Sequence, residues 1–246
     1  MTEPTSSHNS GPKKARVIAI IPARGGSKGL PGKNLKMIGG MPLIAHSVVH
    51  AIESGVCDRV LVTTDNEEIR AAAEVAGAWT PFLREAELAQ DLTPTEPVLK
   101  DALERAEALD GVSYDIVVFL QPTDIFREPE WIARAVDTLK TRPEIDCCFV
   151  ANKTHKNFWV QEDDGSWTRV FDWMAIYGPR QTRKPLFRED TGIASALRSE
   201  LIRAGRRTGD KAEIIQIDDT ASGIDIHDAF DFHLAETALD WRKGNR

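Results

Sequence analysis

The chain has 246 residues, of which 41% are hydrophobic, so it can bury one sizeable core and form a single large α/β domain. Its 31 Lys and Arg residues against 38 Asp and Glu residues give a net charge of -7, which argues against broad binding to nucleic acid but is compatible with a local basic pocket. The sequence contains no run of about 18 apolar residues, so we expect no segment to cross a membrane.

The polar segment 1–15 contains Pro, Ser and Gly and lacks the apolar stretch of a secretory signal. It is predicted to be a disordered tail, and residues 16–246 are predicted to form a single domain. The three cysteines have no metal-ligand spacing, and Cys147 and Cys148 lie together in an apolar run. We therefore expect core cysteines in a protein of the reducing cytoplasm.

Four short apolar runs are rich in β-branched or other strand-forming residues and are nearly unbroken, a pattern typical of strands covered on both faces. The segments between them are amphipathic with helical spacing. This alternation predicts an α/β fold with a Rossmann-like, doubly wound and mostly parallel sheet. The runs are 16–21, 59–64, 115–120 and 146–151.

Helix ends can also be located in the sequence. Asn66 is expected to cap a helix that Gly77 ends, and Pro97 and Pro129 suit the first turns of two further helices. Near the C-terminus, a short apolar run at 212–217 precedes a helix with one stripe of residues at helical spacing. The stripe consists of Phe230, Leu234, Thr237, Ala238 and Trp241.

The alternating pattern breaks at about residues 152–192. Within this region, "WVQEDDGSWTRVF" alternates around an Asp-Gly turn, which predicts a β-hairpin. We interpret the region as an insertion that leaves the sheet and reaches a partner or a substrate.

A glycine-rich, cationic stretch directly follows the first predicted strand. In an open α/β sheet, ligands bind beyond the carboxyl ends of the strands, so this loop is expected to contact a ligand. Glycines let backbone amides approach an anion, and the cations supply charge, a combination that suits polyphosphate. The stretch matches neither the P-loop nor the dinucleotide-binding glycine pattern. Its glycines and cations are Arg24, Gly25, Gly26, Lys28, Gly29, Gly32 and Lys33.

Four stretches together resemble the CMP-N-acylneuraminate synthetase family, the cytidylyltransferases that activate acidic sugars. The most specific is "IPARGGSKGLPGKN" at 21–34, followed in order by "LREAELAQDLTPT" at 83–95, "QPTDIFR" at 121–127 and "GIDIHDAFDF" at 223–232. The resemblance extends from about residue 16 to 240. It implies a nucleotidyltransferase-type sheet with an inserted β-hairpin region for dimerisation.

The resemblance implies transfer of CMP from CTP to the anomeric hydroxyl of a 2-keto sugar acid, with release of pyrophosphate and with Mg²⁺, for which Mn²⁺ could substitute. Such a reaction needs positioning, cations and a metal more than a protein nucleophile. Arg24, Lys33 and Asp225 are the implied catalytic residues. The implied nucleotide-binding residues are Arg24, Gly25, Gly26, Ser27, Lys33, Asn34, Arg84 and Thr95.

Two of these residues have plain structural alternatives. Arg84 and Thr95 match the segment that would bind cytosine, and hydrogen-bonding groups discriminate strongly there because a wrong base leaves them unpaired. Arg84 could instead be a surface charge, and Thr95 could cap the helix that starts near Pro97.

The metal and sugar sites follow from the same resemblance, with departures. Asp225 matches the first metal-binding aspartate of the family, but His227 stands where the second is expected, and Mg²⁺ prefers carboxylate oxygens to imidazole. Asp124, which replaces a serine of the family pattern, is a candidate for the compensating carboxylate. Alternatively, Asp228 and Asp231 only cap a helix and His227 lies in a loop. Sugar binding is assigned to Gln121, Arg180 and Gln181.

In the family, the inserted region forms much of a homodimer interface. Trp159, Trp167, Phe171 and Trp173 are of the aromatic type found at such interfaces, and core packing within one subunit is the alternative. The partners we expect are CTP, a sugar acid and a second copy of the chain, with no nucleic acid and no membrane.

The sequence therefore predicts CMP activation of sialic acid or another nonulosonic acid. Activation of an eight-carbon keto-deoxy sugar acid is the alternative within the same chemistry. A catalytically silent CTP-binding homologue is the alternative from another class, because His227 and the altered "QPTDIFR" are changes expected in an active site that has lost its activity.

Overall fold

The computed structural model of the chain describes residues 14–244. The predicted tail therefore lies outside the described residues, except for its last two. None of the helices between residues 14 and 244 has the length and apolarity that crossing a bilayer requires.

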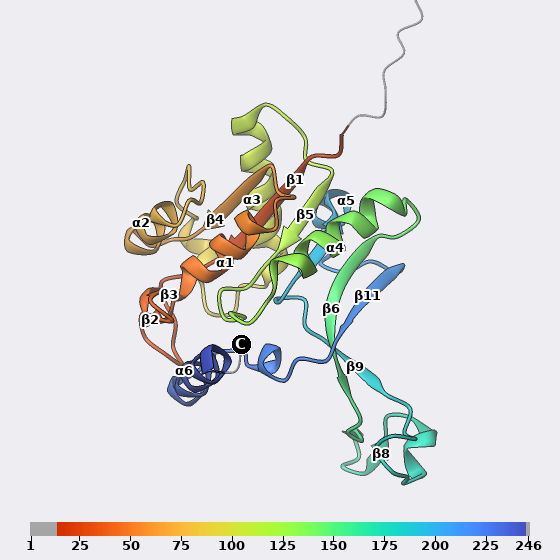
Figure 1. Cartoon of the computed structure of the whole chain (residues 1–246). Coiled ribbons are helices and arrows are strands. Elements are labelled where there is room, and N and C mark those ends of the chain that lie inside the picture. Colours follow the sequence, from red (N-terminus) through yellow and green to blue (C-terminus); the bar gives the residue numbers. More distant parts are fainter. Residues whose placement is uncertain (1–13, 245–246) are drawn as a thin grey trace, which may run out of the picture.

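A seven-stranded sheet forms the centre of the fold (Figure 1). Its order is β11-β6-β10-β5-β1-β4, and β9 pairs with β6. The four predicted strands are confirmed. The sheet is parallel except at β10 and β9, which run antiparallel to their neighbours. The strands are β1 (Val17–Pro22), β4 (Arg59–Thr63), β5 (Ile116–Phe119), β6 (Cys147–Thr154), β9 (Leu186–Glu189), β10 (Ser195–Arg198) and β11 (Ala212–Ile217).

Helices cover both faces of the sheet, as the unbroken apolar strands predict. Side chains of β1 alternate between the two faces: Ile21 packs into the core beneath α1, α2 and α4, and Ile20 into the core beneath α3 and α5. Cys147 and Cys148 are buried and free, one in each core, which confirms them as core residues. The helices are α1 (Leu43–Glu53), α2 (Glu67–Val75), α3 (Thr95–Asp110), α4 (Pro129–Thr141) and α5 (Ser199–Arg203).

Short elements lie at the carboxyl edge of the sheet, and two of them, β2 (Met37–Ile38) and η4 (Ala221–Gly223), contribute to a third, smaller core that includes α6 (Ala229–Gly244). The predicted terminal helix is confirmed, but most of its apolar stripe is exposed: Phe230, Leu234 and Trp241 face solvent, and Ala235 is the buried residue. Ala235 packs in this third core together with Ile38 of the β2 strand, and Leu239 packs against it, so this face of α6 is the buried one. The short elements are η1 (Lys33–Leu35), β2 (Met37–Ile38), β3 (Met41–Pro42), η2 (Ala86–Ala89) and η4 (Ala221–Gly223).

An arm leaves the body of the molecule where β6 and β9 continue past the sheet as a two-stranded ribbon (Figure 1). The arm carries the predicted hairpin, which is confirmed as β7 (Trp159–Gln161) and β8 (Trp167–Arg169), followed by η3 (Asp172–Ala175). Gly165 has a φ of 85° in its turn, a conformation that favours glycine. The arm has several exposed apolar side chains, namely Phe158, Trp159, Val160, Trp167, Val170, Phe171, Ile176 and Tyr177.

The predicted helix caps are also present. The Asn66 side chain accepts hydrogen bonds from the amides of Glu68 and Ile69 at the start of α2, and Gly77 follows the helix with a φ of 100°. At α6, the Asp228 carboxylate accepts from the amides of Phe230 and Asp231, which confirms it as a cap.

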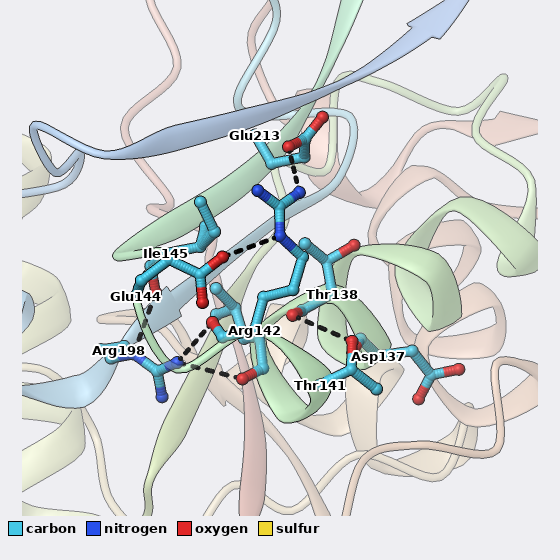
Figure 2. A network of polar contacts seen from close by, with 9 residues as sticks. Asp137, Thr138, Thr141, Arg142, Glu144, Ile145, Arg198 and Glu213 are labelled. Atoms are coloured by element: carbon cyan, nitrogen blue, oxygen red, sulfur yellow. Dashed lines mark hydrogen bonds and ion pairs between the residues drawn. The ribbon is translucent and has the colours of Figure 1, made fainter.

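A polar network at the amino edge of the sheet joins the end of α4 to β10 and β11 (Figure 2). The Arg198 guanidinium donates to the carbonyls of Leu139, Arg142 and Ile145 at 3.0, 3.2 and 3.0 Å. Arg142 in turn pairs with Glu144 and Glu213. The network satisfies carbonyl groups that the end of a helix leaves without intrahelical partners.

Replacing Arg198 with alanine is expected to lower the free energy of unfolding by about 2 to 3 kcal/mol, because three carbonyls lose a charged donor at once. Urea denaturation measures this change. Arg134→Ala, at an exposed position of α4, is the control and should change the free energy by less than about 0.5 kcal/mol. Equal effects of the two variants would contradict the structural role of Arg198.

Candidate active site

The parallel strands place several chain segments at one edge of the sheet. The carboxyl ends of β1, β4 and β5 lie together, because these strands pair in parallel. The segment that leads into β10 reaches the same edge, because β10 runs antiparallel to β5. The loop after β1 thus meets the loop after β5 and the segment before β10, at the edge where ligands bind in open α/β sheets.

A cavity of about 460 Å³ opens at this edge beside the glycine-rich loop. Gln121, from the loop after β5, lines this cavity together with residues that are predicted to bind the nucleotide. Gly25 and Gly26 are not on the cavity wall, and the Gly25 amide donates to Asp65 Oδ1 at 2.9 Å. The predicted residues that line the cavity are Arg24, Ser27, Lys33, Asn34, Arg84, Thr95, Gln121 and His227.

The glycine-rich loop is fixed from two sides. The buried Asn34 side chain donates to the Arg24 carbonyl at 3.0 Å and so ties the ends of the loop together. On the other side, a Cβ at Gly29 would lie 2.5 Å from the His227 carbonyl oxygen. Glycine at position 29 therefore allows the loop to pack directly against segment 225–227.

Lys33 links the loop to the same segment by a hydrogen bond. Its ammonium group donates to the Ile226 carbonyl at 2.7 Å. Burial lowers the pKa of Lys33 from its usual value, and the negative charge of Asp225 opposes this shift. The lysine is thus held at the cavity wall beside an acidic residue.

Asp91 neutralises two cations of the cavity. Its carboxylate pairs with Arg24 at 3.0 Å and also with Lys28, and the hydrogen bond from Lys28 lowers the pKa of this carboxyl group. Asp91 belongs to the second of the four motif stretches, but its role is not predictable from the sequence. An anionic ligand in this cavity would compete with Asp91 for Arg24 and Lys28.

Asp91→Asn is therefore expected to bind inorganic triphosphate about three- to tenfold more tightly, a modest gain because exposed ion pairs are weak competitors for the cations. Isothermal titration calorimetry measures the affinity. Glu87→Gln, an exposed carboxylate of the neighbouring η2, is the matched control and should leave it unchanged. Weaker binding by the Asp91 variant would mean that this carboxylate organises the cations instead of competing with the ligand.

Arg84 and Thr95 also line the cavity. Arg84 is buried, donates to the carbonyl and the hydroxyl of Thr63, and has its pKa lowered to about 10 by burial. The surface-charge alternative for Arg84 is therefore wrong. Thr95 is the first residue of α3 and its side chain makes no capping bond; Pro94 takes the cap position. The capping alternative for Thr95 is likewise wrong.

A second cavity of about 460 Å³ adjoins the first. Gln121 and His227 line both, so the two cavities form one continuous site. Asp124 is buried, and burial raises its pKa to about 7, against the effect of Arg127. The other lining residues are Arg188, Glu189, Asp190, Thr191, Gly192, Arg207 and Asp225.

The predicted metal residues Asp225 and His227 lie at the boundary of the two cavities. His227 Nδ1 is 3.4 Å from Asp225 Oδ1, and that oxygen is buried without a hydrogen-bond partner among the described residues. Between residues 14 and 244, no three His, Cys, Asp or Glu side chains are grouped so that they could hold a metal ion. Asp231 accepts hydrogen bonds from the His227 and Asp228 amides and so fixes this segment.

A family model described as cytidylyltransferase matches residues 18–204. The chain belongs to the cytidylyltransferase family. It is 32% identical over 229 residues to a CMP-N,N'-diacetyllegionaminic acid synthase from Legionella pneumophila, a match that covers 92% of this chain and 97% of the relative.

Two further comparisons agree. An N-acylneuraminate cytidylyltransferase from Escherichia coli is 32% identical over 228 residues, covering 91% of this chain and 52% of the relative. The solved structure of a CMP:2-keto-3-deoxy-manno-octonic acid synthetase complexed with CTP superposes with a TM-score of 0.67 and 16% identity, covering 93% of this chain and 100% of that one. The predicted family and the α/β nucleotidyltransferase fold are confirmed.

The folded chain does not bring all the predicted sugar residues together in one cavity. Arg180 and Gln181 lie on the arm, where Arg180 lines a cavity of about 820 Å³. Gln121 does not line this arm cavity. Arg188 lines both the arm cavity and the second cavity and so connects them.

Several residues of the site escaped the sequence analysis. Arg207 lines the second cavity from the loop after α5 and pairs with Glu96 at 3.5 Å. Asp190 lies directly after β9, in the segment that leads to β10, and its carboxylate accepts a hydrogen bond from Asn152 at 3.0 Å. Both lie in segments without a motif, and their place in the cytidylyltransferase site depends on the antiparallel pairing of β10, which the sequence pattern did not indicate.

Proposed function

We propose that this cytidylyltransferase transfers CMP from CTP to the anomeric hydroxyl of a sialic acid or another nonulosonic acid and releases pyrophosphate. One observation carries the proposal. A cavity with Arg24, Lys28 and Lys33 on its wall continues, through Gln121 and His227, into a second cavity of a size that suits a sugar. The names of the two relatives support the class of acceptor.

In this proposal the acceptor oxygen attacks the α-phosphorus of CTP, a P–O bond forms, and the bond to the β-phosphate oxygen breaks. Negative charge grows on the phosphoryl oxygens and on the departing pyrophosphate. Arg24 and Lys33 are positioned to stabilise that charge, and Lys33 is held in place by the Ile226 carbonyl. No residue is assigned as the general base.

The cytosine of CTP is proposed to lie against Arg84 and Thr95. Two of the Arg84 nitrogens are already bound to Thr63, which fixes the direction of the guanidinium. Preset hydrogen-bonding groups discriminate strongly between bases, because a wrong base leaves them unpaired.

The Asp225 carboxylate fits a role as ligand of Mg²⁺, for which Mn²⁺ could substitute. Its Oδ1 is buried without a hydrogen-bond partner among the described residues, and Mg²⁺ is commonly held by one or two carboxylates together with phosphates and water. When bound, the ion would neutralise phosphate charge. His227 and the buried Asp124 remain candidate additional ligands on the second cavity.

The acceptor is proposed to occupy the second cavity beside Gln121, where Arg188 and Arg207 offer positive charge to its carboxylate. We further propose that the chain is a homodimer. The exposed aromatic side chains of the arm suit an interface. Burial of the arm in such an interface would bring Arg180 and Gln181 toward the site of the partner subunit. Free cysteines fit a cytoplasmic location.

The proposal is tested by measuring pyrophosphate release from CTP and Mg²⁺ with N-acetylneuraminic, N,N'-diacetyllegionaminic, pseudaminic and octulosonic acids. ATP, GTP and UTP serve as nucleotide controls. We expect release with CTP and at least one nine-carbon acid, together with a CMP-sugar detected by mass spectrometry.

Two results would overturn the proposal. Conversion of the octulosonic acid alone would favour the eight-carbon alternative. CTP binding by calorimetry without product from any acid would favour the silent homologue, and His227→Asp would then test whether restoring a second aspartate restores activity.

A further inference from the structure

Arg127 is a buried cation at the edge of the acceptor cavity that does not line it. Only 2% of its surface is exposed. Its guanidinium donates to the carbonyls of Gln121 at 2.7 Å and Gly192 at 2.9 Å, to the Ile193 carbonyl, and to the Ser47 hydroxyl at 2.7 Å. One side chain thus joins the loop after β5, the segment before β10 and helix α1.

These contacts fix the backbone of Gln121 on both sides of its α-carbon. The Gln121 amide donates to the Gly192 carbonyl at 2.8 Å. The Gln121 carbonyl accepts from Arg127 and, at 3.0 Å, from the Ser47 hydroxyl. A residue whose amide and carbonyl are both held by buried partners can direct its side chain in few ways.

Gly192 leaves the space that the Gln121 side chain occupies. A Cβ at position 192 would overlap Gln121 Oε1 and Asp124 Oδ2. The φ of Gly192 lies outside the left-handed region, so backbone conformation does not demand glycine there. A larger residue at position 192 would instead displace the two polar side chains of the acceptor cavity that lie over its α-carbon.

We infer that Arg127 and Gly192 are positioning residues that together set the Gln121 side chain for the acceptor sugar. The inference rests on the proposed function, in which Gln121 contacts the acceptor. Arg24, Lys33, Arg84 and Thr95 belong to other elements. Gln121 also lines the nucleotide cavity, but disturbing the clamp formed by Arg127, Gly192 and Gln121 leaves these four residues in place and therefore impairs acceptor binding more than CTP binding.

Arg127→Lys and Gly192→Ala test the clamp. Lysine keeps the charge but cannot reproduce the fork of donors that reaches both the Gln121 and Gly192 carbonyls. Alanine adds one methyl group where Gln121 Oε1 lies. Each variant is expected to raise the KM for N,N'-diacetyllegionaminic acid at least about tenfold, since a displacement near 1 Å can cost about a hundredfold. The Kd for CTP should change less than about twofold.

Two control variants separate positioning from general damage. Arg198 also donates to three carbonyls, but at the opposite edge of the sheet (Figure 2), so Arg198→Lys should lower the melting temperature and leave the acceptor KM unchanged. Gly209→Ala places a methyl group against Asp146 before β6 and should behave likewise. An equal rise in acceptor KM in these controls would overturn the inference.

Hydrogen exchange tests the clamp without relying on activity. Amides of 119–124 and 190–194 should exchange faster in Arg127→Lys and Gly192→Ala, while those of 83–95 keep their wild-type rates. Unchanged exchange in both segments, or an equal loss of CTP affinity and acceptor affinity, would overturn the clamp. If the wild type converts no acid while these segments alone exchange faster, the proposed function fails and the clamp stands.

Discussion

Lys33→Met is expected to lower kcat at least about a hundredfold, the scale on which removal of one preorganised charge donor acts at a phosphoryl or acyl transition state. The reason is geometric. The ammonium group is held at 2.7 Å from the Ile226 carbonyl, on the wall of the cavity that carries Arg24. Methionine keeps much of the length and apolar volume but supplies neither charge nor donor. Pyrophosphate release under saturating CTP and acceptor measures kcat.

Lys36→Met is the matched control, because Lys36 lies in the same short stretch and its side chain is exposed. It should retain wild-type kcat within about twofold, as surface substitutions usually do. A Lys33→Met enzyme with more than half the wild-type kcat would show that Lys33 has no part in stabilising the transition state.

The pH profile gives a second readout for the same residue. Burial lowers the pKa of Lys33, so the protonated, active form is lost as pH rises through a value below that of a free lysine. Lys33→Arg keeps a cation that does not deprotonate in this range. The alkaline limb of the pH–rate profile of Lys33→Arg should therefore lie at higher pH than that of the wild type, even if the variant has a lower maximal rate.

How far the sequence determines this fold can be seen from two strands. The run at 16–21 is apolar on both faces. It folds as β1 between two helical layers, because only helices on both sides remove all of its apolar side chains from water. The strand β10 has the sequence Ser-Ala-Leu-Arg, which carries no such pattern. Its position is decided by pairing with β5 and β6, residues about 50 to 80 positions away. The hydrophobic pattern of a short segment does not predict a pairing between strands that lie so far apart in the sequence.

The same distinction applies to the site. The glycine-rich loop was identifiable because its residues carry their chemistry locally: Arg24 and Lys33 supply charge wherever the loop lies. The role of Gly192 depends on Gln121, 71 positions earlier in the chain, resting over its α-carbon. Asp91 was visible in a motif, but its pairing with Arg24 and Lys28 appears only in the folded chain.

Asp225→Asn is the other substitution with a large expected effect, about a hundredfold or more in kcat/KM, because an amide is a much weaker ligand than a carboxylate for a hard dication. Asparagine preserves size and leaves the neighbouring caps of α6 at Asp228 and Asp231 intact. Raising the Mg²⁺ concentration should restore part of the lost activity. Asp163→Asn, on the exposed hairpin of the arm, is the carboxylate control.

Direct ion binding decides what the Asp225 effect means. Electron paramagnetic resonance of Mn²⁺ in the presence of CTP should show weaker binding in Asp225→Asn than in the wild type or Asp163→Asn. In His227→Asp, the ion should bind more tightly, because a second carboxylate joins Asp225 two residues away, where a histidine now stands 3.4 Å from it. If Mn²⁺ binding is the same in all four proteins, Asp225 is not a metal ligand, and its carboxylate instead acts on Lys33, whose pKa its charge raises.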